Sequence, residues 1–403
     1  MGKRLTLTCT LALACTALFS AVANAGEGAP PYAQASEKDK IHWQHFSELA
    51  VLETPYMSSK PVDLADGIKV GSLQEQQNGK VLVESFANEL ATGKHGNYDS
   101  LLIAKNNELL FESYFLRGRV DLSHPQSSAT KTYTSLALGR AMQLGYLSMA
   151  DLDRPLTYFL KDLDPSKFAE GAKDITLRQS LTMTTGIRIS EEGWDALQAD
   201  PSKIKGQNEV QAIFERTAPI TEVSRTFKYG TGPQFVMQVI EAVVPGTAKA
   251  FIKTELLDKL GIQNYGWKTA ASGLPESGWR VSLTSRDMAK VGLLAINNGK
   301  WHGEQLIPKA YIKEATTRHL FNGDDDIFGG GKDVKNQGYG FFWWGTDLQS
   351  AGKTYEAVSA QGGGGMFIFL IRDLDLVIVV TAHHREHDTQ QLVAERIIPA
   401  FIQ

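Results

Sequence analysis

Hydrophobic residues change their spacing twice along this 403-residue chain. Near residues 100 and 370 they form short apolar runs, whereas between these regions they recur every three or four residues. Short apolar runs bounded by turn residues predict strands, and the longer spacing predicts helices. The predicted fold class is therefore α+β: an antiparallel sheet built from both chain ends, with flanking helices and an inserted, mostly helical lobe.

Two strand pairs define the expected sheet. Segments 101–104 and 109–115 are predicted to form a hairpin across Asn106 and Asn107, which tolerate positive φ. Segments 366–371 and 376–381 flank a turn at 372–375. Apolar residues at helical spacing predict helices over 72–92 (from Val81, Val83, Phe86 and Leu90), 133–144, 235–240, 288–296 and 392–401.

The first 25 residues resemble an export signal. Lys3 and Arg4 precede an apolar stretch that ends in Ala23-Asn24-Ala25, a small-x-small cleavage pattern. We therefore expect a signal peptide over 1–25, cleavage after Ala25, and a periplasmic or secreted enzyme. Two alternatives stay open: a retained membrane anchor, and a lipoprotein attached through Cys15.

Removing this segment also removes both cysteines of the chain, Cys9 and Cys15. The mature protein could then use neither disulfides nor a catalytic thiol, so its stability would depend on its hydrophobic core. Net charge would change from −4 to −6. This acidic balance, without a long basic tract, argues against a nucleic-acid partner, and we expect no membrane association after signal cleavage. Residues 26–67 are predicted to be a polar, irregular leader, either packed on the surface or partly mobile.

A serine nucleophile is sought in Ser-x-x-Lys patterns, because the chain has no Gly-x-Ser-x-Gly elbow and no Walker loop. The pattern occurs at Ser128/Lys131, Ser202/Lys205 and Ser350/Lys353. A lysine can act as a neutral base only where burial desolvates it. Only the first pair opens a helix expected to be buried. The alternative is an ordinary N-cap serine and a solvated lysine.

Two further segments could join this site. Tyr229 lies among small residues just ahead of the helix predicted near 235, although such a tyrosine can also belong to an ordinary turn. Gly362 to Gly365 lead directly into the strand at 366–371, where missing side chains would let a ligand approach the backbone. A flexible loop or a bulge would explain the same glycines.

Together these motifs resemble the serine hydrolases of the β-lactamase and penicillin-binding family. Ser128-x-x-Lys131 is similar to the first family motif, Tyr229-Gly230-Thr231 to Tyr-x-Asn, and Gln361-Gly362-Gly363 to Lys-Thr-Gly. Segments 181–186 and 283–289 also resemble family sequences. The resemblance spans about residues 70–403. It is closest to the class C-like branch, with family VIII esterases and nylon-oligomer hydrolases.

The resemblance implies a β-lactamase/transpeptidase-like domain over 68–403. Its α/β lobe would comprise 68–127 and 335–403, and its helical lobe 128–334. Ser128 would form an acyl-enzyme while Lys131 and Tyr229 share the proton transfers. The N–H groups of Ser128 and Gly364 would bind the oxyanion, with Gly364 uncertain by one residue. No metal or cofactor is implied.

Two positions depart from the β-lactamase pattern. Gln361 replaces a lysine and Thr231 an asparagine; with Gly362 and Gly363 they are the expected substrate-binding residues. The lost positive charge would have to come from Arg280 or Arg385. These changes favour a small-molecule ester or amide as substrate. A β-lactamase or D-alanyl carboxypeptidase, and a non-catalytic ligand-binding descendant, remain alternatives.

Residues outside these motifs allow other interpretations. The segment from His383 to His387 matches the zinc signature His-x-x-Glu-His, but it follows a strand, so we expect a turn and no metal site. Asp324-Asp325-Asp326 is interpreted as an acidic loop tip. Trp194, Trp343 and Trp344 could line a pocket or belong to the core.

Overall fold

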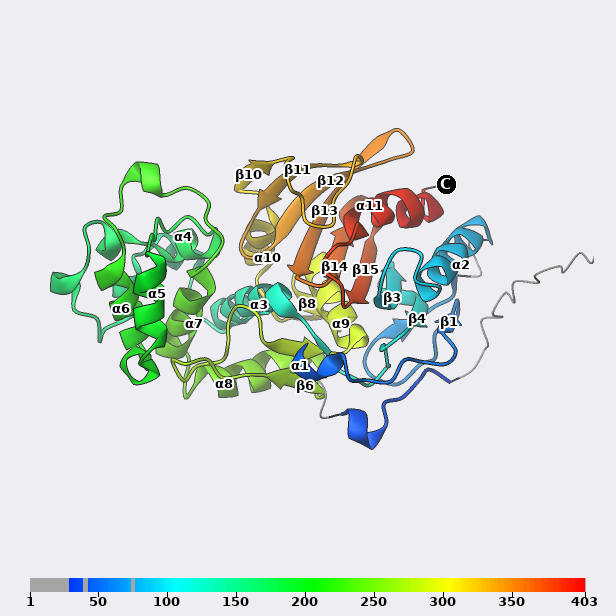
Figure 1. Cartoon of the computed structure of the whole chain (residues 1–403), viewed down its shortest axis with the longest axis horizontal. Helices are drawn as coiled ribbons and strands as arrows, with labels where there is room; N and C mark the ends of the chain where they lie inside the picture. The colour runs from blue at the N-terminus through cyan, green and yellow to red at the C-terminus, as the bar shows by residue number, and fades with distance from the viewer. Residues whose placement is uncertain (1–28, 39–42, 74–76, 403) are drawn as a thin grey trace, which may run out of the picture.

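The computed structural model describes residues 29–38, 43–73 and 77–402. The predicted signal peptide, with Cys9 and Cys15, lies outside the described residues. One large sheet stands at one end of the molecule, and helices α4 to α7 gather at the other (Figure 1).

The sheet joins the two ends of the chain as predicted. Its strand order is β1-β4-β3-β15-β14-β13-β12-β11-β10, with β2 parallel to β4 and every other pair antiparallel. The central pairing of β3 with β15 places Ile103 opposite Ile378. The strands are β1 (Tyr56–Ser58), β2 (Lys69–Val70), β3 (Tyr98–Lys105), β4 (Glu108–Tyr114), β10 (Leu320–Gly323), β11 (Val334–Tyr339), β12 (Trp344–Ser350), β13 (Lys353–Gly362), β14 (Met366–Ile371) and β15 (Leu376–Ala382).

Both faces of the central strands are buried, which explains their uninterrupted apolar sequences. Successive side chains point to opposite faces. Ile368 and Leu370 of β14 therefore enter one core, and Phe367 and Phe369 enter the other. Helix α2 (Gln77–Ala91) and the C-terminal segment 389–400, which begins with α11 (Thr389–Leu392), cover the second face.

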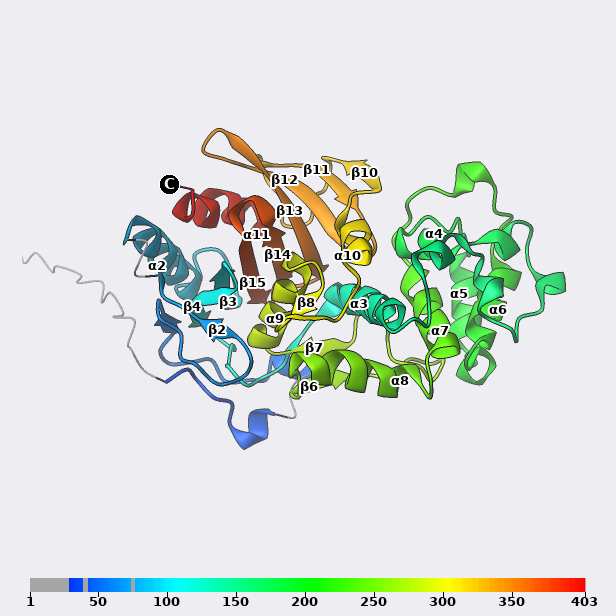
Figure 2. The same ribbon diagram turned by 180° about the vertical axis from the view of Figure 1, so that it is seen from behind.

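The first face is covered by α9 (Ser285–Ile296), which packs on β14 and β15 although it belongs to the stretch expected to form the helical lobe. Helix α3 (Thr130–Gln143) lies between this region and the lobe (Figure 2). The remaining helices are α1 (Trp43–Phe46), α4 (Leu177–Leu181), α5 (Glu191–Gln198), α6 (Asn208–Arg216), α7 (Gly232–Val243), α8 (Ala248–Phe251) and α10 (Lys309–Thr316).

Two small sheets complete the fold. Strands β5 (His124–Pro125), β7 (Val281–Leu283) and β6 (Tyr265–Trp267) form one, and β8 (Lys300–Trp301) with β9 (Glu304–Gln305) forms the other. The three-stranded sheet positions part of the candidate site. Its β5–β7 pairing places His124 and Pro125, just before Ser128, opposite Leu283 and Ser282.

Most predicted elements are confirmed. Asn106 and Asn107 join the predicted hairpin with φ of 51° and 65°. Of the four apolar residues that predicted helix α2, Val83, Phe86 and Leu90 are buried, whereas Val81 is 67% exposed. The stretch expected to be an irregular leader contributes β1 to the sheet, and its Phe46 is buried.

Among the described residues, no single helix is long and apolar enough to cross a membrane. The consecutive helices 232–243 and 248–260 meet that test of length and composition only together, and they are bent by 90°.

Gly292 allows α9 to approach the sheet. A Cβ atom there would overlap Val377 Cγ1 and lie 3.0 Å from Ile368 Cγ2. Because the packed core cannot absorb a larger side chain, G292V is expected to lower the free energy of unfolding by about 1–3 kcal/mol. Denaturant unfolding measures this change. The control V81A, at an exposed helical position, should change it by less than about 0.5 kcal/mol; equal effects of both substitutions would contradict this packing.

Candidate active site

Ser128 lies in a tight turn that links β5 to α3. The turn Ser127–Ala129 directly precedes the helix, and Gln126 N–H donates to the carbonyl of Val281 at 2.8 Å. Ser127 has a φ of 48°, a left-handed conformation that is uncommon for residues other than glycine. Such backbone strain is frequent at functional sites. The turn places Ser128 at the N-terminal end of α3.

Lys131 follows one helical turn later and faces Ser128. Its Nζ lies 3.1 Å from Ser128 Oγ and donates to the carbonyl of Gly278 at 2.8 Å. The side chain is 7% exposed, because every residue of α3 from Thr130 to Met142 is buried. Desolvation lowers the pKa of Lys131 to about 8, against the opposing charge of Glu276. With this pKa, about a tenth of Lys131 is the free amine at pH 7 and about half of it at pH 8.

Helix α3 itself holds the segment that carries the Gly278 carbonyl. Thr130 Oγ1 accepts from Val281 N–H at 3.2 Å, and Thr134 Oγ1 donates to the carbonyl of Ser277 at 3.0 Å. Both threonines are buried. The lysine and its carbonyl partner are thus fixed by the same helix.

Tyr229 brings a third functional group to this place. Lys131 Nζ lies 4.6 Å from the centroid of its ring. Protein atoms around the hydroxyl desolvate the phenolate and raise the pKa of Tyr229, although 39% of the whole side chain is exposed; a hydrogen bond with Ser128 acts in the opposite direction. Tyr229 is therefore a proton donor at neutral pH.

The loop that carries Tyr229 is held by the segment at 181–186. Lys228 N–H donates to the carbonyl of Met183 at 2.9 Å, and a Cβ at Gly232 would overlap the Ser180 carbonyl. The ring of Tyr229 stacks on Trp344, with centroids 5.7 Å apart. This contact places Trp344 beside the site, whereas Trp343 is 1% exposed in the core and Trp194 packs against the core edge.

The glycine run lies directly beside the nucleophile turn. A Cβ at Gly362 would overlap the Gln126 carbonyl, and one at Gly363 would lie 3.4 Å from Ser127 Oγ. Gly365 N–H donates to the Gly362 carbonyl at 3.2 Å, so it is not available to a ligand. This arrangement is compatible with Gly364 N–H as the oxyanion donor, which stays a prediction.

Gln361 and Thr231 are the other two predicted substrate-binding residues. Gln361 is 5% exposed on β13, and its Nε2 donates to Ser359 Oγ at 2.9 Å. Its amide nitrogen is therefore already hydrogen-bonded to a residue of the same strand. Thr231 is half-buried immediately before α7. Contacts of Thr231 and Gln361 with a substrate remain predictions.

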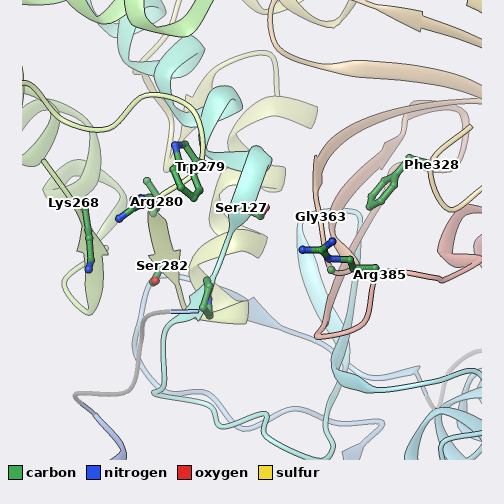
Figure 3. Close-up of a pocket in the computed structure, with 11 residues that line it drawn as sticks. Ser127, Lys268, Trp279, Arg280, Ser282, Phe328, Gly363 and Arg385 are labelled. Carbon is green, nitrogen blue, oxygen red and sulfur yellow. The ribbon is translucent and has the colours of Figure 1, made fainter. Parts of the chain in front are cut away.

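A cavity of about 610 Å³ opens next to Ser127, Gly363 and Gly364. Figure 3 shows Lys268, Trp279 and Arg280 on one side of Ser127, and Phe328 and Arg385 on the other. The guanidinium of Arg385 extends from its loop toward Ser127 (Figure 3).

Three cations of this cavity have no ion pair within the described part of the chain: Lys268, Arg280 and Arg385. The Arg280 guanidinium lies 4.1 Å from the ring centroid of Trp279. The sequence had indicated these two arginines as possible replacements for the positive charge that a β-lactamase carries at the position of Gln361. Lys268 was not anticipated, because a single lysine in a short strand-flanking segment carries no sequence signal.

The zinc signature does not form a metal cluster. His383 to His387 lie in the turn between β15 and α11, as expected, and no group of three or more potential ligands is found among the residues that the structure describes. Asp324, Asp325 and Asp326 lie in the exposed loop after β10.

Comparisons with solved structures show the fold. The chain is similar to a penicillin-binding protein homologue from Caulobacter crescentus (TM-score 0.59, 15% identity, covering 80% of this chain and 97% of that one). It is also similar to EstCE1, a hydrolase with promiscuous acyltransferase activity (TM-score 0.59, 16% identity, 81% and 99% covered). A third similar structure is a candidate 6-aminohexanoate-dimer hydrolase from Bacillus anthracis (TM-score 0.56, 16% identity, 87% and 89% covered).

No curated protein matches the sequence. The family model named Beta-lactamase, however, matches residues 31–398, nearly the whole chain. Together with the Ser128–Lys131–Tyr229 geometry, this match shows that the chain belongs to the Beta-lactamase family of serine hydrolases.

Proposed function

We propose that this protein is an exported serine hydrolase that cleaves a small ester or amide through an acyl-enzyme on Ser128. The observation that carries the proposal is the pairing of Ser128 Oγ with a buried lysine amine 3.1 Å away. A solvated lysine would be protonated at neutral pH and could not accept the serine proton.

The reaction would proceed in two steps. Lys131, with Tyr229 as its partner in proton transfer, accepts the Ser128 proton while Oγ attacks the carbonyl carbon. The N–H groups of Ser128 and Gly364 stabilise the tetrahedral oxyanion. The proton then passes to the leaving alcohol or amine as its bond breaks. Water attacks the acyl-enzyme, and the acid is released as Ser128 recovers its proton.

The cavity supports a substrate that carries a negative charge. Lys268, Arg280 and Arg385 lack internal counter-ions, and guanidinium groups bind carboxylates in a bidentate manner. Gln361 stands where a β-lactamase has lysine; it is uncharged, and its amide nitrogen is bonded to Ser359 of the same strand. This difference favours an ester or a linear amide over a β-lactam.

Export is proposed from the sequence alone, with cleavage after Ala25 and a periplasmic or secreted location. Attachment as a lipoprotein through Cys15 is the alternative. The reaction needs no cofactor, and the only partner proposed is the small-molecule substrate.

S128A is expected to abolish hydrolysis of every substrate of the enzyme, because it removes the nucleophile. The assay uses nitrophenyl esters of increasing chain length, a chromogenic cephalosporin and a linear amide. We expect the wild type to be fastest on an ester. A cephalosporin as the best substrate would establish the β-lactamase alternative, and no turnover with any member would favour a binding protein. Full activity of S128A would contradict the mechanism.

The pH profile of acylation should report Lys131. Since only the free amine accepts a proton, kcat/KM on an uncharged ester should rise with pH and level off above the Lys131 pKa of about 8. K131R keeps the positive charge but cannot lose it, so kcat should fall by about 10²- to 10⁴-fold. A profile that is flat between about pH 6 and about pH 9 would exclude Lys131 as the base.

Selectivity for a charged substrate is tested at the cavity arginines. R385A and R280A should each lower kcat/KM on a succinyl ester by about 10-fold or more, because a charge-assisted hydrogen bond is lost. Their activity on a neutral ester of equal length should stay close to wild type. R154A, at an exposed arginine paired with Asp151, serves as the control. Equal losses on both esters would contradict recognition of an anion.

A further inference from the structure

A buried carboxylate lies next to the proposed site but takes no part in its chemistry. Asp99 of β3 is fully buried, and its Oδ2 lies 3.0 Å from His124 Nε2 and 2.7 Å from His383 Nδ1. Its Oδ1 accepts from Arg117 N–H at 3.0 Å. We call Asp99, His124, His383 and Arg117 the Asp99 network.

Each ring nitrogen of the two histidines has a hydrogen-bond partner. Arg117 Nη1, which can only donate, lies 2.6 Å from His383 Nε2, and Asp99 Oδ2 faces His383 Nδ1 on the other side of the ring. His124 instead faces the Pro125 carbonyl from Nδ1 and Asp99 from Nε2. Both of these partners are hydrogen-bond acceptors, so the His124 ring is tied at once to the Asp99 carboxylate and to the backbone of the nucleophile turn.

The network therefore surrounds a buried carboxylate with two imidazole rings. Burial would raise the pKa of the Asp99 carboxyl, but hydrogen bonds from the two imidazoles hold it below its usual value. The Phe46 ring covers both histidines, with centroids 4.2 Å from His124 and 6.2 Å from His383. Removing one member of a paired, desolvated network leaves the others unsatisfied, which is costly.

The two histidines lead to opposite walls of the site. On one side, the His124 carbonyl accepts from Gln126 Nε2 at 2.9 Å, two residues before Ser128. On the other side, His383 is followed by His384, whose N–H donates to the Gly364 carbonyl at 3.2 Å. One carboxylate thus connects the turn that carries Ser128 to the glycine run that carries Gly364.

We propose that Asp99, His124 and His383 are positioning residues that hold the Ser128 turn and the Gly364 amide at the separation required by the tetrahedral oxyanion. The inference rests on the proposed function. These residues touch neither the substrate nor the reacting atoms. Their proposed role is to stabilise the transition state, and they do not bind the substrate.

The test compares two substitutions at His383. In H383N, the side-chain amide nitrogen replaces Nδ1 as the donor to Asp99, whereas H383A removes the donor. With a neutral nitrophenyl ester, we expect H383A to lower kcat by about 10- to 100-fold and to change KM by less than about twofold, as for a misplaced catalytic group. H383N should retain kcat within about threefold of wild type.

An arylboronic acid, which forms a tetrahedral adduct, gives a second readout. Its inhibition constant should rise in H383A by the same factor as kcat falls, because both measure stabilisation of the tetrahedral state. A control is H95A, which removes another histidine–carboxylate pair, His95 with Glu89 at 2.8 Å, at α2. H95A should leave kcat and boronate affinity unchanged.

If H383A does not fold, H383N is compared with H383Q, whose amide is one methylene farther out and points toward Arg117 instead of Asp99. Wild-type kcat and boronate affinity in H383A, or in H383Q, would overturn the positioning role. Failure of the proposed function has a different signature, since wild type itself would then show no hydrolysis and no modification of Ser128 by a fluorophosphonate.

Discussion

The burial of the Lys131 side chain is the constraint on which the proposed chemistry depends. Burial disfavours its ammonium form, because the Gly278 carbonyl and Ser128 Oγ replace only part of the hydration that the charge has in water, and no ion pair of Lys131 occurs within the described residues. This desolvation follows directly from the architecture. Helix α3 lies between the sheet and the helical lobe and is buried almost along its whole length. The same packing that stabilises the core therefore supplies a base for Ser128.

The large sheet, which joins the two ends of the chain, positions the glycine run and the Asp99 network of the site. Strand β13 ends at Gly362, where the backbone contacts the turn before Ser128 so closely that no side chain fits. The antiparallel pairing of β3 with β15 brings Asp99 and His383 together from positions 284 residues apart. Proton transfer and the proposed oxyanion hole thus depend on different parts of the fold: the first on a helix, and the second on the sheet and its connecting turns.

Sequence patterns predict the features of this fold that depend on residues close together in the chain. Apolar runs identified the central strands, asparagine identified the hairpin turn, and the spacing of Ser128 and Lys131 placed both on one helix face. The Asp99 network could not be predicted, because its partners lie 25 and 284 residues away and each histidine looks unremarkable in its own segment. Strand β1 was missed for a similar reason: its three residues are a strand only because β4 offers them an edge.

Identification of the modified serine after reaction with a fluorophosphonate tests the central claim most directly. Ser127 and Ser128 are adjacent, and Ser127 borders the cavity, so peptide mass mapping must assign the adduct to one of them. The account predicts one equivalent of label on Ser128, with labelling retained in S127A and lost in S128A. Label on Ser127 or on another residue, or no label in the wild type, would contradict it.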